Sequence, residues 1–361
     1  MPHIFNYDQH ELQEALVLLG SQKFRAKQIM QWLYHHDITD FVNMNNLPKT
    51  LRSQLSEHFS IQIPTVASEN ISPCGTIKWL FDFDANNAVE TVFIPEKNRG
   101  TLCISSQIGC ALACQFCATG LVGFYRNLTT AEIIAQVWFA RAELQKRFPD
   151  APRLTNIVFM GMGEPLLNEQ NVFRAVRILL DDLGFGLSKH RVTISTSGIV
   201  PAMKRLVDSS EAALAVSLHA PNNTVRDSIV PINKQYNLDK LMAICDEYIQ
   251  KKNRIVTYEY VMLAGINDQD QHAHELTRLL RDKKVKVNLI PYNPVDGLEL
   301  KCSSEEQINR FQRILLAKNI RTTVRKTRGD SINAACGQLY GHVVSRKKTI
   351  QANQFMHEQT R

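Results

Sequence analysis

Three cysteines, Cys110, Cys114 and Cys117, lie within eight residues, and their spacing constrains this chain more than any other feature. Cysteines at i, i+4 and i+7 in a short apolar loop can direct three sulfur atoms at one centre, and such soft ligands favour iron–sulfur clusters, zinc or copper(I). A structural zinc site normally has a fourth ligand nearby, but the next cysteine is Cys245 and the next histidine is His190. Three thiolates on a four-iron cluster leave one iron open to a substrate or cofactor. The spacing therefore favours a reactive cluster, with zinc or inert core thiols as alternatives.

Cysteines in the pattern Cys-x3-Cys-x2-Cys after a predicted strand resemble the signature of the radical S-adenosylmethionine (SAM) enzymes. Four more segments narrow the resemblance to the RNA adenine C2-methyltransferases that act on 23S ribosomal RNA and transfer RNA. They are residues 101–107 (TLCISSQ), 161–165 (GMGEP), 217–221 (SLHAP) and 335–339 (ACGQL), and the match runs over nearly the whole chain. The resemblance implies a four-iron four-sulfur (4Fe-4S) cluster held by Cys110, Cys114 and Cys117.

Short β-branched runs alternate with helical stretches from residue 101 onward, which predicts parallel βαβ units. The runs are residues 101–105, 156–160, 191–195, 214–217, 255–261, 285–290 and 322–324. From this pattern alone, the units form a full or partial barrel or an open, doubly wound sheet, and the resemblance implies a partial (β/α)6 radical SAM barrel. In either α/β architecture, ligands gather at the carboxyl ends of the strands, where the distinctive segments lie.

The chain divides into four predicted parts. Residues 1–70 form a helical N-terminal module, residues 71–100 a β-hairpin extension, residues 101–320 the barrel core, and residues 321–361 a basic C-terminal segment that carries Cys336. By resemblance the N-terminal module binds RNA; from the sequence alone it is equally well a helical cap on the core.

Binding of SAM is implied by the resemblance at seven positions: Gly163, Glu164, Ser195, Ser217, Leu218, His219 and Asn293. Without the resemblance these signals are weak, because Gly-x-Gly turns are common and a histidine at the end of a strand is more often structural than a ligand contact. We also expect the two glycines of residues 161–165 to permit close approach of the backbone to a ligand.

Two cysteines and one carboxylate match the catalytic positions of the resembled family. There Cys336 takes a methyl group from one SAM, a radical derived from a second SAM removes hydrogen from that methyl, and the carbon adds to adenine carbon 2. Cys103 then attacks the sulfur of Cys336, which releases the product and leaves a disulfide. Glu90 matches the proton acceptor. From the residues alone, a strand glutamate more often faces solvent, whereas an inward-facing one would hold a proton more readily, which suits proton transfer.

Charge and composition bear on partners and compartment. The net charge is +7, and residues 321–348 hold seven basic residues against one acidic residue, which indicates either a polyanion-binding patch or a solvated face. With Cys336 in the same stretch, we expect 23S ribosomal RNA and transfer RNA as partners. Eight cysteines without a signal peptide or an apolar run of membrane-spanning length predict a cytoplasmic protein with no membrane association. The implied chemistry also needs an electron donor and a reductant for the Cys103–Cys336 disulfide.

Two other functions are compatible with the sequence. The sister activity methylates adenine carbon 8 with the same cysteines, although residues 123–128 (GFYRNL) are more similar to the carbon 2 group. The second alternative is a non-catalytic, metal-containing RNA-binding protein with a structural zinc, which would lack the brown colour of an iron–sulfur protein after anaerobic purification.

Overall fold

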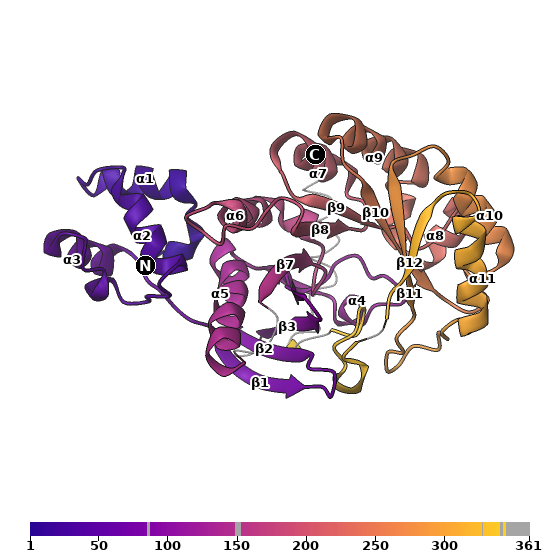
Figure 1. Ribbon diagram of the computed structural model, residues 1–361, viewed down its shortest axis with the longest axis horizontal. Helices are drawn as coiled ribbons and strands as arrows, with labels where there is room; N and C mark the ends of the chain where they lie inside the picture. The colour runs from indigo at the N-terminus through magenta and orange to yellow at the C-terminus, as the bar shows by residue number, and fades with distance from the viewer. Residues whose placement is uncertain (85–86, 149–152, 327, 340–341, 344–361) are drawn as a thin grey trace.

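A computed structural model describes residues 1–84, 87–148, 153–326, 328–339 and 342–343 of the chain. Its N-terminal part forms a lobe of three helices beside the main body (Figure 1), namely α1 (Gln9–Leu18), α2 (Arg25–Tyr34) and α3 (Lys49–His58). Helix α1 begins with a capping box, in which Asp8 accepts a hydrogen bond from the backbone of Glu11 and Glu11 accepts one from the backbone of Asp8. The indole of Trp138 donates a hydrogen bond of 2.9 Å to the Leu33 carbonyl and links the lobe to the core.

One large sheet runs through the main body, and within the described residues it contains eleven strands. Its first four strands pair antiparallel: β1 (Thr65–Ile71), β2 (Ile77–Asp84), β3 (Asn87–Glu96) and β4 (Arg99–Cys103). From β4 the sheet continues in parallel through β7 (Leu154–Phe159), β8 (Val192–Thr196), β9 (Ala213–Ser217), β10 (Val256–Met262), β11 (Val285–Pro291) and β12 (Arg321–Val324). The partial barrel is confirmed; its seven parallel strands correspond to the seven predicted runs, one more than the six of the (β/α)6 barrel that the resemblance implied.

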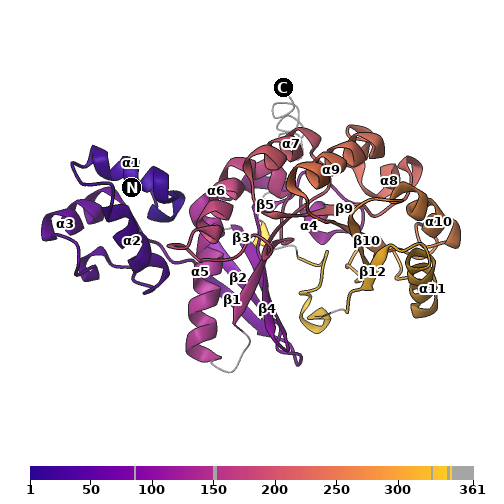
Figure 2. The same cartoon turned by 45° about the horizontal axis from the view of Figure 1, so that its top comes forward.

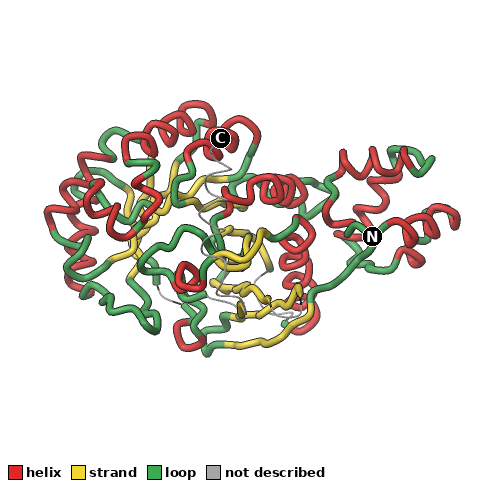
Figure 3. Tube along the Cα trace, turned by 180° about the vertical axis from the view of Figure 1, so that it is seen from behind, coloured by secondary structure: helices red, strands yellow, loops and turns green. Residues whose placement is uncertain are grey.

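Helices cover the outer face of the curved parallel sheet, as Figures 2 and 3 show from two further directions. They are α5 (Thr130–Arg147), α6 (Glu169–Leu180), α7 (Val200–Ser209), α8 (Asn223–Ile229), α9 (Leu238–Lys252), α10 (Asp270–Leu279) and α11 (Glu305–Leu316). Strand residues such as Ile157, Ile194 and Val216 are fully buried, as expected of a parallel sheet covered by helices. None of the helices in the described ranges is long and apolar enough to cross a bilayer.

All seven β-branched runs of the sequence are strands, but three features were not predicted. The first is strand β1, which extends the antiparallel part. The second is a separate pair of short strands, β5 (Gln107–Gly109) and β6 (Phe124–Asn127), which flank the cysteine loop. The third is the short helix α4 (Ala118–Val122), which lies between the cysteine loop and β6. The first predicted run, residues 101–105, ends as a strand at Cys103. Part of the predicted hairpin turn, residues 85–86, lies outside the described residues. Strand β13 (His342–Val343) pairs with β3.

Candidate active site

The N-terminal end of the loop from Cys110 to Cys117 is fixed by close backbone contacts with Gly123. Gly109 has a φ of 74°, and a Cβ atom added there would lie 1.8 Å from the carbonyl oxygen of Gly123, so that only glycine fits. The N–H of Cys110 donates a hydrogen bond of 2.9 Å to the same carbonyl. The loop is therefore closed at its base, and its three thiols project from a defined position.

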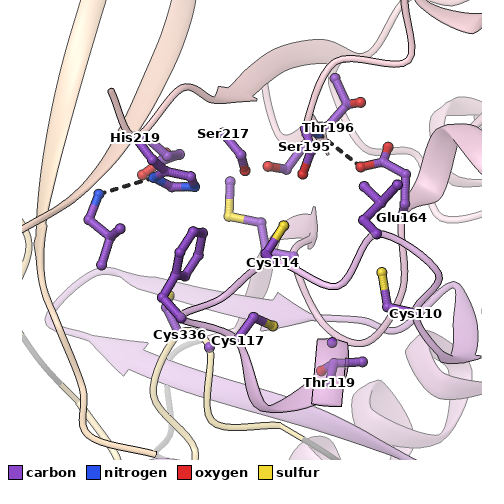
Figure 4. Close-up of a pocket in the computed structure, with 18 of the residues that line it drawn as sticks. Cys110, Cys114, Cys117, Thr119, Glu164, Ser195, Thr196, Ser217, His219 and Cys336 are labelled. Carbon is purple, nitrogen blue, oxygen red and sulfur yellow. Dashed lines mark hydrogen bonds between the residues drawn. The ribbon is translucent and has the colours of Figure 1, made fainter. Parts of the chain in front are cut away.

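All three loop thiols line one cavity of about 160 Å³ at the carboxyl ends of the parallel strands (Figure 4). Burial raises the pKa of the Cys110 thiol and raises that of Cys114 to about 12, and the neighbouring thiols add to both effects. Metal ligation would stabilise these groups as thiolates.

The donor set fits an iron–sulfur cluster better than a single ion. In the part of the chain that the structure describes, no three His, Cys, Asp or Glu side chains are close enough to ligate one metal ion. A four-iron cluster does not require such closeness, because each thiolate binds a different iron. Three soft sulfur donors from one short loop, facing one cavity, match a cluster that leaves one iron for another molecule.

The segment of residues 161–165 packs against residues 104–107, which lead into the cysteine loop. A Cβ atom on Gly163 (φ 96°) would lie 2.5 Å from the Gln107 side chain, and one on Gly161 would lie 2.7 Å from the Ile104 carbonyl oxygen. The two glycines thus allow residues 161–163 to approach residues 104–107 of the same chain closely. From the sequence we expected them to permit close approach to a ligand. Glu164 follows on the cavity wall.

Glu164 is 3% exposed and its carboxylate is held by the backbone. It accepts hydrogen bonds from the N–H groups of Ser197 (2.8 Å) and Leu166 (3.1 Å). Burial raises the pKa of this carboxyl, and the hydrogen bonds to Ser197 oppose the change. Glu164 therefore presents a fixed acceptor to the cavity.

The ends of β8 and β9 contribute Ser195, Ser217 and His219 to the same cavity (Figure 4). The Nδ1 atom of His219 accepts a hydrogen bond of 3.1 Å from the N–H of Val261, which leaves the proton of the neutral ring on Nε2. Burial, followed by the positive charge of Arg226, lowers the pKa of His219 to about 3. His219 is therefore a neutral hydrogen-bond donor at physiological pH.

Five of the seven predicted SAM-binding residues meet at this cavity: Gly163, Glu164, Ser195, Ser217 and His219. The other two lie apart. The Leu218 side chain is fully buried in the core, and Asn293 lines a second cavity.

Arg226 was not singled out from the sequence, yet it joins the loops that follow β8 and β9. Its guanidinium is fully buried and donates hydrogen bonds to the carbonyl oxygens of Ser197 (2.7 Å), Ser217 (3.0 Å) and Leu218 (3.0 Å). Burial lowers its pKa to about 10, so it remains charged. An arginine on the short helix α8 carries no sequence signal of this kind, because its partners are backbone atoms of distant residues.

A second cavity, of about 370 Å³, adjoins the first and contains Cys103. Four residues line both cavities: Met160, Ile290, Arg325 and Cys336. Cys336 is reached by solvent, yet protein atoms surround it within the cavities, and this burial raises the pKa of its thiol, which Arg325 opposes. Burial, then the nearby Cys336, raises the pKa of Cys103. Cys336 thus lies between the cysteine-loop cavity and the Cys103 cavity.

The segment that carries Cys336 is tied to two walls of the site. Asn293 donates a side-chain hydrogen bond of 3.1 Å to the Cys336 carbonyl, and Ala118 donates its N–H to the Gly337 carbonyl at 2.7 Å. The Thr119 hydroxyl donates to the carbonyl of Leu339. The segment is therefore held both by the end of β11 and by the helix that follows the cysteine loop.

Glu90 faces inward and is 5% exposed, but it is not among the residues that line either cavity. Sequence reasoning missed its partner, Lys78, whose Nζ atom lies 2.8 Å from the Glu90 carboxylate. The hydroxyl of Ser105 also donates a hydrogen bond of 2.6 Å to the Glu90 carbonyl. The carboxylate therefore has a counter-charge next to it.

Three basic residues of the C-terminal segment, Arg325, Lys326 and Arg328, line the second cavity together with Arg99 and Lys286. These five cations and one acid, Glu96, give a net positive lining, here called the basic rim, to the cavity that contains Cys103 and Cys336. Of the other four basic residues of this stretch, Arg321 begins β12 and does not line the cavity, whereas Arg346, Lys347 and Lys348 lie outside the described residues.

Two family models match the chain. Residues 104–277 match the radical SAM superfamily, and residues 3–61 match the ribosomal RNA large subunit methyltransferase N-terminal domain. The first match contains the cysteine loop and the loops after β7, β8 and β9, and the second covers the three-helix lobe.

Curated relatives and a solved structure match nearly the whole chain. It is 49% identical over 370 residues to the dual-specificity RNA methyltransferase RlmN of Stenotrophomonas maltophilia, covering 97% of this chain and 92% of the relative. It is also 49% identical over 350 residues to RlmN of Alkalilimnicola ehrlichii, covering 97% and 96%. A crystal structure of a radical SAM methyltransferase from Sphaerobacter thermophilus superposes with a TM-score of 0.87 at 43% identity, covering 94% of this chain and 99% of that one.

Proposed function

Because the chain belongs to the RlmN family of dual-specificity RNA methyltransferases, within the radical SAM superfamily, we propose that it methylates carbon 2 of an adenine in 23S ribosomal RNA and in transfer RNA. The observation that carries the proposal is the position of Cys336, which lines both cavities. One cavity holds the three loop thiols, and the other holds Cys103 within a basic rim. A thiol between them can receive a methyl group on one side and present it to RNA on the other.

Cys110, Cys114 and Cys117 would hold the 4Fe-4S cluster, and Glu164, Ser195, Ser217 and His219 would bind SAM beside it. When bound, the cluster supplies the single electron that makes SAM a radical source, which is needed because an aromatic C–H carbon is too weak a nucleophile to attack a SAM methyl directly. We propose two SAM molecules per turnover, one as methyl donor and one as radical source. The protein would orient each of the two SAM molecules so that its reactive group faces the sulfur of Cys336.

Release of the product is assigned to Cys103 and Glu90. Glu90 accepts the proton that leaves adenine carbon 2, and the unpaired electron left on the ring by the radical addition passes to a one-electron acceptor, so that the ring becomes aromatic again. The Cys103 thiolate attacks the sulfur of Cys336, a disulfide forms, and the bond between that sulfur and the transferred carbon breaks. The electron pair of this bond remains on the carbon, which takes up a proton and becomes the methyl group. An external thiol reductant must then reduce the Cys103–Cys336 disulfide, and a one-electron donor must serve the cluster.

RNA would contact two surfaces. The rim formed by Arg325, Lys326 and Arg328 carries the charge that phosphates need next to the second cavity. The helical lobe within residues 1–70 would bind RNA farther from the cysteines, which agrees with the family model that it matches. Residues 101–320 would then supply the chemistry, and residues 321–361 the carrier thiol.

An anaerobic assay with RNA and isotope-labelled SAM tests the proposal. We expect both 5′-deoxyadenosine and an adenine labelled at carbon 2, identified by chromatography and mass spectrometry against authentic standards. Label at carbon 8 would assign the sister activity. Absence of 5′-deoxyadenosine from protein that contains the cluster would contradict the radical route altogether.

A further inference from the structure

Lys78 connects two parts of the proposed transfer site. Its Nζ atom lies 2.8 Å from a carboxylate oxygen of Glu90 and donates a hydrogen bond of 3.1 Å to the backbone carbonyl of Asn333, three residues before Cys336. We infer that Lys78 is a positioning residue that supplies the counter-charge of the Glu90 carboxylate and holds it next to the segment that carries Cys336. This inference rests on the proposed function.

The sheet register places Lys78 on the same face as Cys103. Lys78 lies opposite Val92, and Val92 lies opposite Cys103, so the three side chains form one row across β2, β3 and β4. Glu90 is two residues from Val92 in the same strand and therefore points to the same side. Lys78, Glu90 and Cys103 thus share the face towards which the Cys336 segment is held.

The other face of the antiparallel strands is packed against helix α5. Trp79 and Phe81, which alternate with Lys78 along β2, contact Phe139 with ring centroids 6.0 Å and 5.1 Å apart. This packing fixes which way the strand faces. Lys78 therefore cannot turn to solvent without a change of register.

The ion pair between Lys78 and Glu90 is buried, so each charge depends on the other for stabilisation. The side chains of Lys78 and Glu90 are 10% and 7% exposed, so water does little to stabilise either charge. A buried charge is costly unless a counter-charge lies beside it. The ammonium of Lys78 is that counter-charge for the Glu90 carboxylate, and the ion pair fixes the position of the carboxylate.

The contact with Asn333 links this base to the carrier segment. Asn333 adopts a φ of 50°, in the left-handed region, and its carbonyl points to the lysine. An ammonium has three donors and can satisfy a carboxylate and a carbonyl at once. Lys78 thereby holds Glu90 and the chain next to Cys336 in one arrangement.

The experiment measures how fast the covalent protein–RNA adduct at Cys336 is resolved in a single turnover. We expect Lys78→Met and the milder Lys78→Gln to slow this step by about 10-fold to 100-fold, and Lys78→Arg to restore most of the rate. Methylation of Cys336 by SAM, followed by the mass of its peptide, should slow by no more than about fivefold, the effect of losing the one hydrogen bond to Asn333. The matched control is Lys283→Met, which breaks an ion pair of 2.6 Å to Asp246 away from the cavities and should leave the adduct step unchanged.

A double-mutant cycle decides whether Lys78 acts through Glu90. If it does, adding Lys78→Met to Glu90→Gln changes the resolution rate by no more than about twofold beyond Glu90→Gln alone. Effects that multiply, or wild-type resolution in both Lys78→Met and Lys78→Gln, would overturn the inference. If the wild-type protein itself forms neither adduct nor methylated RNA, the proposed function fails, which is a different result.

Discussion

The side-chain amide of Asn293 donates a hydrogen bond of 3.1 Å to the backbone carbonyl of Cys336. The sequence resemblance assigned Asn293 to SAM binding, but in this structure it lines the cavity of Cys103 and holds the segment of the proposed methyl carrier. One residue at the end of β11 thus connects the strand ends of the barrel to the C-terminal segment.

Replacing Asn293 with Ala should slow methylation of Cys336 by SAM. The net free energy of one such hydrogen bond is about 1 kcal/mol, which corresponds to a change of about fivefold in rate. The rate is measured from the mass of the Cys336 peptide, and SAM affinity from equilibrium binding. An unchanged methylation rate with weaker SAM binding would show that the amide serves SAM and not the carrier segment.

Single replacement of Cys110, Cys114 or Cys117 with Ala should abolish the cluster and all 5′-deoxyadenosine, while the fold remains. The loop thiols stand on a cavity wall, whereas the core is held by buried apolar strands and helices. Iron content and visible absorption report the cluster, and circular dichroism reports the fold. Cys245→Ala is the matched control, because that thiol is buried in helix α9 away from the cavity. A variant without all three loop cysteines that still cleaved SAM would refute the cluster assignment.

Arg325, Lys326 and Arg328 should contribute to the salt dependence of RNA binding. Each phosphate contact adds about 0.7 to 0.9 to the slope of log affinity against log salt, so neutralising all three residues should weaken binding and flatten that slope. The control neutralises Lys204, Lys251 and Lys252, which are ion-paired on α7 and α9. Equal effects of the two triple variants would indicate non-specific charge, and no effect of the first would move the phosphate contacts to the helical lobe.

The cysteine spacing and the strand alternation were enough to predict the loop, the parallel sheet and the edge where ligands gather, because they depend on local periodicity. Lys78 and Arg226 could not be found in this way. The partner of Lys78 depends on the register between β2 and β3, and Arg226 is held by carbonyl oxygens from two other strand ends. The small β5–β6 hairpin was missed because its strands are too short to carry a period.

The free energy of unfolding should fall in mild acid because of the lowered pKa of His219. Its pKa is about 3 in the folded protein and 6.5 in the unfolded chain, so below pH 6.5 the unfolded chain binds a proton that the folded protein does not. Stability is unaffected by this group above pH 6.5 and falls as the pH drops towards 3, by about 1.4 kcal/mol at pH 5.5. Denaturant unfolding of wild type and His219→Gln at pH 7.5 and 5.5 measures the difference.

The matched control for that comparison is His190→Gln, since His190 is exposed in a loop. It should retain the wild-type loss of stability between the two pH values, whereas His219→Gln should lose about 1.4 kcal/mol of it. Identical pH dependence in wild type and His219→Gln would mean that the buried ring takes up a proton in the folded state.

Replacing Cys336 and replacing Cys103 should stop the reaction at different steps. Cys336→Ala removes the carrier, so no carbon should pass from SAM to the protein and no methylated RNA should form. Cys103→Ala leaves the carrier and the radical addition in place but removes the thiolate that breaks the carbon–sulfur bond.

The most direct measurement is therefore denaturing gel electrophoresis of Cys103→Ala after anaerobic reaction with RNA and SAM. The account predicts a band of slower mobility that disappears on digestion with RNase, contains label from the SAM methyl group, and is absent from Cys103→Ala/Cys336→Ala. Normal turnover by Cys103→Ala, with no RNA bound covalently at any time, would contradict transfer through Cys336 and Cys103.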